Sequence, residues 1–289
     1  MQLVINLLIN GAVEGLMTAL IALALVAIYL VARFPQAATG DYVTAGAYSA
    51  YIVYTKVAAS MVIAGLAAAS AIAILSLTYF FLVFGRFRGR TYVSPLLASV
   101  GVAFLTRNVL TFFVGHDPIV FPTPLLPPIR LDPILLQPID LVVVAAALIV
   151  LGILSILLRS TDIGREIRAV SDDPDLAKIS GIRSRQVLII VWLIVGLICG
   201  VCGFLLAIRS VVEPDLGWNL LLNGFAGAIL GGLTSFPGAV VGSLLIGLAQ
   251  ELSIPLVGGS YKLAVPFLVI LVVLLVKPAG LFGRVAKVR

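Results

Sequence analysis

The sequence predicts an all-α fold, a polytopic transmembrane bundle of about eight or nine helices, and three observations lead there. First, 61% of the 289 residues are hydrophobic, only 11% are charged, and the mean hydropathy is +1.19. A soluble domain has about 25% charged residues, so too few polar groups are present to cover a single water-facing domain. Second, runs such as 16–32 are apolar on every side, whereas the strands of a membrane β-barrel alternate. Third, the apolar residues fall into stretches near the roughly 20 residues that span a bilayer.

Nine apolar stretches follow one another along the chain. They cover residues 7–31, 42–55, 58–84, 93–114, 141–158, 187–208, 220–233, 239–256 and 263–276. The stretches 42–55, 220–233 and 263–276 are too short to cross without flanking residues, which leaves eight or nine crossings. Short or broken helices are tolerated in a membrane only where they line a cavity or are buried in protein. We expect residues 1–289 to form a single transmembrane domain.

Basic residues orient the predicted helices, because cytoplasmic loops carry an excess of Lys and Arg. With the N-terminus outside and nine crossings, 14 of the 19 basic residues fall on the inner side. These are Arg33, Arg86, Arg88, Arg90, Arg159, Arg165, Arg168, Lys178, Arg183, Arg185, Lys277, Arg284, Lys287 and Arg289. The outer side receives Lys56, Arg130, Arg209 and Lys262. The sequence therefore predicts an outer N-terminus and an inner C-terminus, and the net charge of +6 does not point to nucleic acid.

The predicted outer loop, residues 115–140, is rich in proline. It holds seven of the 15 prolines: Pro118, Pro122, Pro124, Pro127, Pro128, Pro133 and Pro138. Proline fixes φ and removes a hydrogen-bond donor, so we expect a stiff, extended segment over the outer mouth. Two interpretations stay open, a rigid connector and a docking ledge for an extracellular partner.

The predicted inner loop, residues 159–185, contains the pattern of a short helix. Asp173 is placed to cap the free amides, Pro174 suits the first helical position, and Asp175 complements the positive helix end. Leu176, Ala177, Lys178 and Ile179 follow, and Gly181 offers a left-handed stop. A helix of about two turns is marginal alone, so Leu176 and Ile179 need a surface to pack on. The alternatives are an ordinary charged loop and a docking helix for a cytoplasmic protein.

Three ionisable residues, Glu14, Arg107 and Glu251, lie inside apolar stretches. Charges within a membrane are rare, usually paired and often functional. Our hypothesis pairs Arg107 with Glu14 or Glu251, against the alternatives of a structural ion pair or snorkelling to the interface. Asn223 is a further polar candidate for the lining of a pathway.

Small residues cluster in the later stretches. Gly196, Gly200 and Gly203 share one helix face, which predicts close helix packing, and Cys199 and Cys202 fit the same role. We find no set of residues for an intramembrane enzyme: the only histidine, His116, lies in a loop and cannot build a metal site alone. An ion-coupled secondary transporter or channel is the alternative to the function below, and it predicts a denser group of carboxylates at mid-membrane.

Four motifs occur in order along the chain. They are Gly40-Asp41-Tyr42-Val43 to Gly46-Ala47-Tyr48; Arg168-Ala169-Val170 through Asp173 and Ala177 to Gly181-Ile182; Gly227-Ala228-Ile229-Leu230-Gly231-Gly232 to Pro237-Gly238-Ala239-Val240-Val241-Gly242; and Lys277-Pro278-Ala279-Gly280-Leu281-Phe282-Gly283. Together they resemble the permease subunits of branched-chain amino-acid ABC importers, and the length resembles the shorter of that family's two permease types. At 36–39 the chain has Gln-Ala-Ala-Thr where the family commonly has Asn-Phe-Ala-His, so substrate identity does not carry over; relatives take leucine-type amino acids, urea or short amides.

The resemblance implies a permease in the inner membrane of a prokaryote, with residues 174–181 as the coupling helix seated in a separate ATPase. The chain has no Gly-x-x-x-x-Gly-Lys-Ser/Thr loop, so it holds no cofactor of its own by that motif and ATP would be used by the partner. The family further implies a second permease subunit, homologous or identical, an extracytoplasmic substrate-binding protein, and transport by alternating access.

Overall fold

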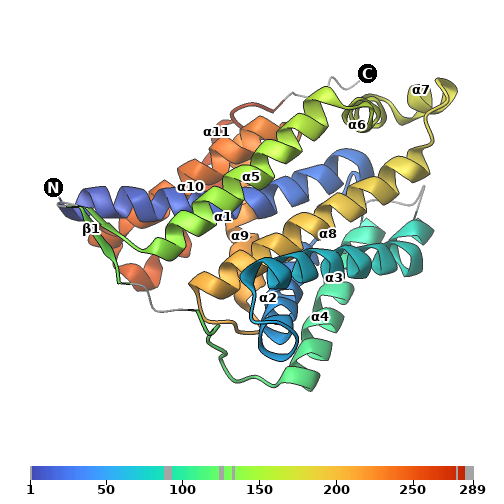
Figure 1. Ribbon diagram of the computed structural model, residues 1–289. Helices are drawn as coiled ribbons and strands as arrows, with labels where there is room; N and C mark the ends of the chain where they lie inside the picture. The colour runs from blue at the N-terminus through green and yellow to red at the C-terminus, as the bar shows by residue number, and fades with distance from the viewer. Residues whose placement is uncertain (1, 88–92, 124–126, 132–133, 278, 284–289) are drawn as a thin grey trace. The chain divides into compact units, whose positions relative to one another are not determined.

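The computed structural model describes residues 2–87, 93–123, 127–131, 134–277 and 279–283, and this part of the chain is almost entirely helical (Figure 1). The α-helices are α1 (Gln2–Ala32), α2 (Thr39–Lys56), α3 (Met61–Leu82), α4 (Val93–Val114), α5 (Pro138–Ser160), α6 (Asp162–Asp172), α7 (Pro174–Ile179), α8 (Ser184–Arg209), α9 (Leu216–Gly231), α10 (Phe236–Val257) and α11 (Ala264–Val276). Two 3₁₀ turns, η1 (Phe84–Phe87) and η2 (Gly259–Tyr261), and two short strands, β1 (Ile129–Leu131) and β2 (Ile134–Leu136), complete the elements.

Each of the nine predicted apolar stretches coincides with a helix, which confirms the helical fold class. Within the described ranges, six helices are long and apolar enough to cross a membrane: α1, α3 with η1, α4, α5, α8 and α10. The other three, α2, α9 and α11, are the stretches that looked too short. The number of eight or nine crossings and the orientation stay predictions. Arg88, Arg90, Arg284, Lys287 and Arg289, used to predict the orientation, and Pro124, Pro133 and Pro278 lie outside the described residues.

The chain forms two compact units. The first unit comprises ranges 1–26, 122–148 and 219–289, and the second comprises 27–121 and 149–218. In the second unit α3 packs against α8, α2 packs on both, and α4 contacts α2 (Figure 1). Glycine permits this closeness: a Cβ at Gly196 would lie 2.6 Å from the Cα of Ala73, and one at Gly203 would lie 2.2 Å from the carbonyl oxygen of Val43. The predicted packing face of α8 is confirmed.

Glycine also sets the packing of the first unit. A Cβ at Gly15 of α1 would lie 2.8 Å from the Cα of Leu244 in α10, and one at Gly231 of α9 would lie 1.9 Å from the carbonyl oxygen of Gly238. After α11, the amide of Leu281 donates to the carbonyl of Leu230 at 2.7 Å. The motif at 227–242 and the described part of the motif at 277–283 therefore pack directly on each other.

The described part of the proline-rich segment is largely extended as far as Gln137, as predicted, and α5 begins at Pro138. At its start, Ile119 pairs with Val212 in a β-bridge, and the buried ring of Phe121 lies 4.9 Å from that of Tyr54, all within the second unit. Further on, β1 and β2 pair antiparallel in the first unit, with Ile129 opposite Leu136. This small β-ribbon is an addition to the all-α prediction.

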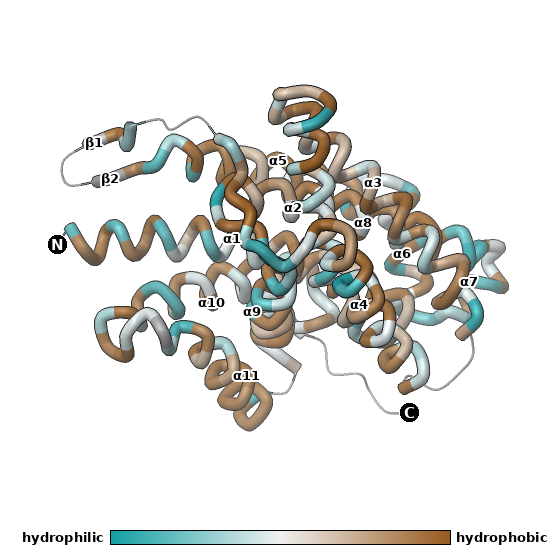
Figure 2. The backbone as a smooth tube through the Cα atoms, turned by 90° about the horizontal axis from the view of Figure 1, so that it is seen from below, coloured by the Kyte–Doolittle hydropathy of each residue, from teal (hydrophilic) through white to brown (hydrophobic). Residues whose placement is uncertain are grey.

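Hydropathy varies sharply along the chain. Figure 2 shows α11 brown along its length, whereas hydrophilic residues gather on α6 and α7. Cys199 and Cys202 are buried within α8 and not joined in a disulfide, which agrees with their predicted role in packing.

Candidate functional site

Two short helices, α6 and α7, form the segment predicted to dock a cytoplasmic protein. Thr161 caps α6 by accepting a hydrogen bond from the amide of Gly164 at 3.3 Å. Asp173 ends α6 and begins α7, where its Oδ1 accepts from the amides of Asp175 and Leu176, both at 3.0 Å. Pro174 occupies the first turn of α7. These contacts confirm the predicted cap, and they satisfy amides that a helix start leaves free.

The end of α7 is closed by Gly181, whose φ is +85°. The amide of Ile182 donates to the carbonyl of Ala177 at 3.0 Å, and that of Gly181 donates to Lys178 at 3.1 Å, which is the Schellman pattern. Ala177 is 3% exposed, whereas Leu176 and Ile179 are 62% and 84% exposed. The helix is therefore anchored through Ala177 and presents two apolar side chains outward.

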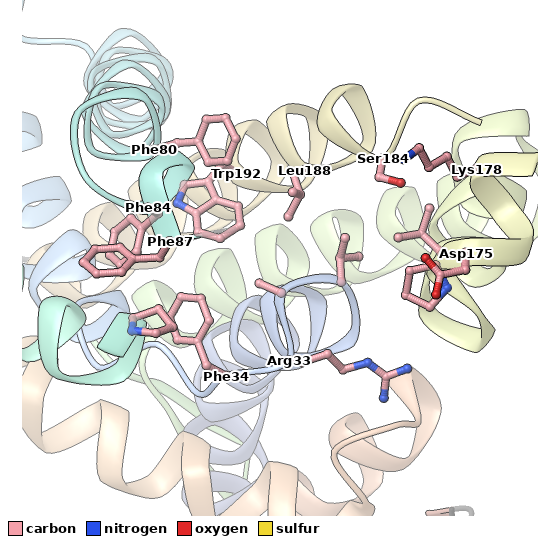
Figure 3. A pocket seen from close by; sticks show the side chains of 15 residues that line it. Arg33, Phe34, Phe80, Phe84, Phe87, Asp175, Lys178, Ser184, Leu188 and Trp192 are labelled. Carbon is pink, nitrogen blue, oxygen red and sulfur yellow. The ribbon is translucent and has the colours of Figure 1, made fainter. Parts of the chain in front are cut away.

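A cavity of about 480 Å³ adjoins this segment inside the second unit. Figure 3 shows Phe80, Phe84, Phe87 and Trp192 gathered at one end and Asp175, Lys178 and Ser184 at the other. The rings of Phe80 and Trp192 lie 5.1 Å apart. The side of α7 that carries Asp175 and Lys178 thus borders open space.

Arg33 ties the end of α1 to the same segment. Its φ is +61°, a conformation that few residues other than glycine adopt. Its guanidinium donates to the carbonyl of Ser171 in the last turn of α6, where the positive charge complements the negative end of the helix. Holding a residue in this region costs about 1–3 kcal/mol, so surrounding contacts must fix the turn.

A second polar site lies around Arg107 on α4. The Nε of Arg107 donates to Asp41 Oδ1 at 2.9 Å, and its Nη1 donates to Asp215 Oδ1 at 2.7 Å. The Arg107, Asp41 and Asp215 side chains are 18%, 0% and 63% exposed. The guanidinium carbon also lies 5.3 Å from the ring centre of Trp218 and 5.8 Å from that of Phe104. We call Arg107, Asp41 and Asp215 the ion cluster.

Two helix starts meet near the ion cluster. Asp41 belongs to the first turn of α2, and Asp215 directly precedes α9. The amide of Gly217 donates to Thr44 Oγ1 at 3.0 Å, and a Cβ at Gly217 would lie 1.9 Å from the carbonyl oxygen of Gly40. The glycine of the Gly40-Asp41 motif and Gly217 therefore let the two helix starts touch.

The segment that departs from the family pattern is buried beside α2. Gln36 donates from Nε2 to the hydroxyl of Tyr42 at 3.0 Å, Thr39 donates to the carbonyl of Gln36 at 2.9 Å, and the amide of Ala37 donates to Ser99 Oγ at 3.1 Å. Among the described residues, Gln36 Oε1 and Asp41 Oδ2 are buried without a hydrogen-bond partner. The start of α2 is thus buried, and two of the buried side-chain oxygens described there lack a hydrogen-bond partner.

The hypothesis for the intramembrane charges needs correction in its partners. We paired Arg107 with Glu14 or Glu251, but the carboxylates on Arg107 are Asp41 and Asp215, and Glu251 pairs with Lys262. Asn223 accepts a hydrogen bond from Gln250 at 3.2 Å. Glu14 lies half-buried in α1. The functional roles of these four residues stay predictions.

The decisive comparison is with families of known proteins. Residues 7–274 match the family model described as the permease component of branched-chain amino acid transport systems. The chain belongs to this family.

Individual relatives agree with the assignment. The permease is 26% identical over 292 residues to BraD of Pseudomonas aeruginosa, a high-affinity branched-chain amino acid transport permease protein, covering 96% of this chain and 95% of that one. It is 33% identical over 132 residues to LivH of Escherichia coli K12, covering 45% of this chain and 43% of LivH. Its fold is similar to PsaBC from Streptococcus pneumoniae in complex with Fab, with a TM-score of 0.51, 14% identity and coverage of 95% and 91%.

These findings make the chain a multi-pass ABC transport permease and not an enzyme. Sequence reasoning missed Asp41 and Asp215 as partners of Arg107, although Asp41 stood in a quoted motif. It also missed α6 as a separate helix. Ile163, Ile167 and Val170 are spaced four and three residues apart, and this helical period could have revealed it.

Proposed function

We propose that this chain is the membrane-spanning subunit of an ABC importer for branched-chain or related amino acids, urea or short amides. A separate cytoplasmic ATPase powers it, a second permease subunit pairs with it, and an extracytoplasmic binding protein delivers the substrate. The whole chain, 1–289, acts as one permease domain in the inner membrane of a prokaryote. It crosses that membrane eight or nine times, and with nine crossings the N-terminus lies outside and the C-terminus inside.

The observation that supports a separate ATPase most strongly is the construction of α7. Its six residues are capped at both ends and anchored by Ala177, while the side chains of Leu176 and Ile179 are exposed. Two exposed apolar side chains on a fixed single turn and a half suit insertion into a groove of another protein. The adjoining cavity gives α7 room to shift, which a packed interior would resist.

The test is to separate ATP hydrolysis from transport in proteoliposomes that hold the assembled transporter. Asp173→Ala removes the cap, which is worth about 1 kcal/mol, and Leu176→Asp places a charge in the proposed groove. For the double variant we expect ATP hydrolysis without leucine uptake, with uptake per ATP reduced at least about tenfold, because the helix no longer seats.

A matched control is available one residue away. Asp172→Ala removes an exposed carboxylate from the end of α6 without touching the cap of α7, and it should leave uptake per ATP unchanged. Normal coupling in Asp173→Ala/Leu176→Asp would reject the assignment of α7.

A further inference from the structure

The charges of the ion cluster do not balance. One guanidinium faces two carboxylates, so with both carboxylates ionised the cluster carries one net negative charge. An excess negative charge attracts a further cation nearby. The Arg107 side chain, which is the cluster's own cation, is already shared between Asp41 and Asp215.

The two carboxylates differ in how firmly they are held. Asp41 is fully buried on the Nε side of Arg107, whereas most of the Asp215 side chain is exposed on the Nη1 side. An ion pair with an exposed partner contributes little net stability. Asp215 is therefore the partner that an incoming carboxylate can replace at low cost, while Asp41 keeps the guanidinium in place.

A second observation also calls for a ligand. Asp41 Oδ2 is buried and has no hydrogen-bond partner among the described residues. Buried carboxylate oxygens are nearly always satisfied, because leaving one bare costs free energy. Asp41 Oδ2 can therefore accept a hydrogen bond from a further donor that enters the ion cluster.

Aromatic rings flank the guanidinium. Trp218 and Phe104 approach Arg107 at 5.3 and 5.8 Å, and Phe104 is largely exposed. Next to the charges the chain thus presents an apolar surface on which a hydrocarbon side chain can pack.

Resting on the proposed function, we infer that Arg107 and Asp215 form a transient recognition site for the zwitterionic head of the transported amino acid. The substrate carboxylate replaces Asp215 on Nη1 of Arg107, and the substrate ammonium pairs with the released Asp215. Because the two groups of an α-amino acid share one carbon, a single molecule can bridge both. Trp218 and Phe104 then face its apolar side chain.

Trp218 provides a local probe of this site, since the chain has only two tryptophans. The assembled transporter, without its binding protein, is placed in nanodiscs, and the emission of a Trp218→Phe variant is subtracted to isolate Trp218. The ligands are leucine, leucinamide, which lacks the carboxylate, and 4-methylpentanoate, which lacks the ammonium. We expect a saturable change with leucine and binding at least about tenfold weaker for both analogues.

Conservative variants assign each half of the zwitterion. Arg107→Gln should remove the preference for leucine over leucinamide, and Asp215→Asn should remove the preference over 4-methylpentanoate. Glu213→Gln is the matched control, because Glu213 is an exposed acid two residues away in the same loop and should keep both preferences. A purely structural cluster predicts instead that both variants weaken all three ligands equally.

Each result decides the inference. No saturable change at Trp218, equal binding of the three ligands, or an equal loss in both variants overturns it. Uptake of leucine by the complete wild-type transporter with ATP and binding protein is measured alongside. If leucine uptake occurs while Trp218 emission does not change, the recognition site is rejected and the proposed function stands; if neither leucine nor urea nor a short amide is taken up, the proposed function itself fails.

Discussion

Replacing Gly217 by alanine is expected to force apart the starts of α2 and α9. A Cβ at this position would lie 1.9 Å from the carbonyl oxygen of Gly40 and 2.7 Å from Thr44 Oγ1, whereas ordinary contacts begin at 3.4 Å. The first turn of α9 must therefore retreat by about 1.5 Å, the difference between 1.9 and 3.4 Å. That retreat also breaks the 3.0 Å hydrogen bond from the Gly217 amide to Thr44 Oγ1.

The expected loss of stability follows from these two contacts. Overpacking costs about 1–3 kcal/mol, and losing one hydrogen bond costs about 0.5–1.5 kcal/mol. Alanine recovers up to about 1 kcal/mol through its better helix propensity. The net loss is about 2 kcal/mol, which corresponds to roughly a 30-fold change in the folding equilibrium.

The assay is thermal unfolding of the purified permease in one detergent, followed by the fraction that still elutes as a single species after heating. Gly101→Ala is the matched control, because it makes the same substitution in α4 where a Cβ meets nothing within 4 Å. That variant should equal or exceed the wild type. The reasoning is refuted if Gly217→Ala unfolds at or above the temperature of Gly101→Ala.

Two further predictions concern the first unit and the topology. Lys262→Met leaves the mostly buried Glu251 without its paired ammonium and should cost about 1–3 kcal/mol in the same unfolding assay. Lys262→Met/Glu251→Gln should recover most of that loss, and equal stability of the two variants would contradict a charge effect. In cells, Gln2→Cys should react with a membrane-impermeant thiol reagent from outside, and Ser180→Cys should react only after permeabilisation. Background reaction is low because Cys199 and Cys202 are buried, and the reverse pattern would invert the proposed orientation.

Helix positions could be predicted from the sequence because their signal is local. The length and composition of each apolar stretch are visible in the sequence itself. The residue that caps the following helix is also nearby in the sequence: before α10, Ser235 accepts a hydrogen bond from the amide of Gly238 at 3.1 Å. The cap of α7 is local in the same way, which explains why Asp173 and Gly181 were both placed correctly. The helix α6 was not predicted, because its many charged residues suggested a loop and hid the helical spacing of Ile163, Ile167 and Val170.

Partners across the fold could not be predicted in this way. Asp41 and Asp215 lie 66 and 108 residues from Arg107, and no local pattern selects them over Glu14 or Glu251. Charge alone allows Arg107 to pair with any acidic residue at a similar depth in the membrane. The hypothesis therefore named Glu14 and Glu251, the acidic residues that lie inside apolar stretches. The correct partners lie instead at helix starts, where the packing of Gly40 against Gly217 decides which side chains meet.

Direct contacts within the second unit link α6 to α4. Arg33 donates to the carbonyl of Ser171 at the end of α6, and four residues after Arg33 the amide of Ala37 donates to Ser99 on α4. Asp41 then binds Arg107 on the same helix. Between these attachments α2 packs closely against the glycines of α8. Because this contact leaves no room for sliding, α2 and α8 are expected to move together.

In the proposed transporter, a shift of α6 and α7 reaches α4 through two attachments, at Ser99 and at Arg107, and Arg107→Gln removes only the second. For this reason we expect Arg107→Gln to alter discrimination between leucine and leucinamide while ATP-driven movement persists through Ser99. Leu176→Asp acts before both attachments and should abolish that movement without altering the charges of the ion cluster. The two variants thus separate recognition from coupling, because Arg107→Gln removes a contact of the ion cluster and Leu176→Asp disturbs only the proposed contact with the ATPase.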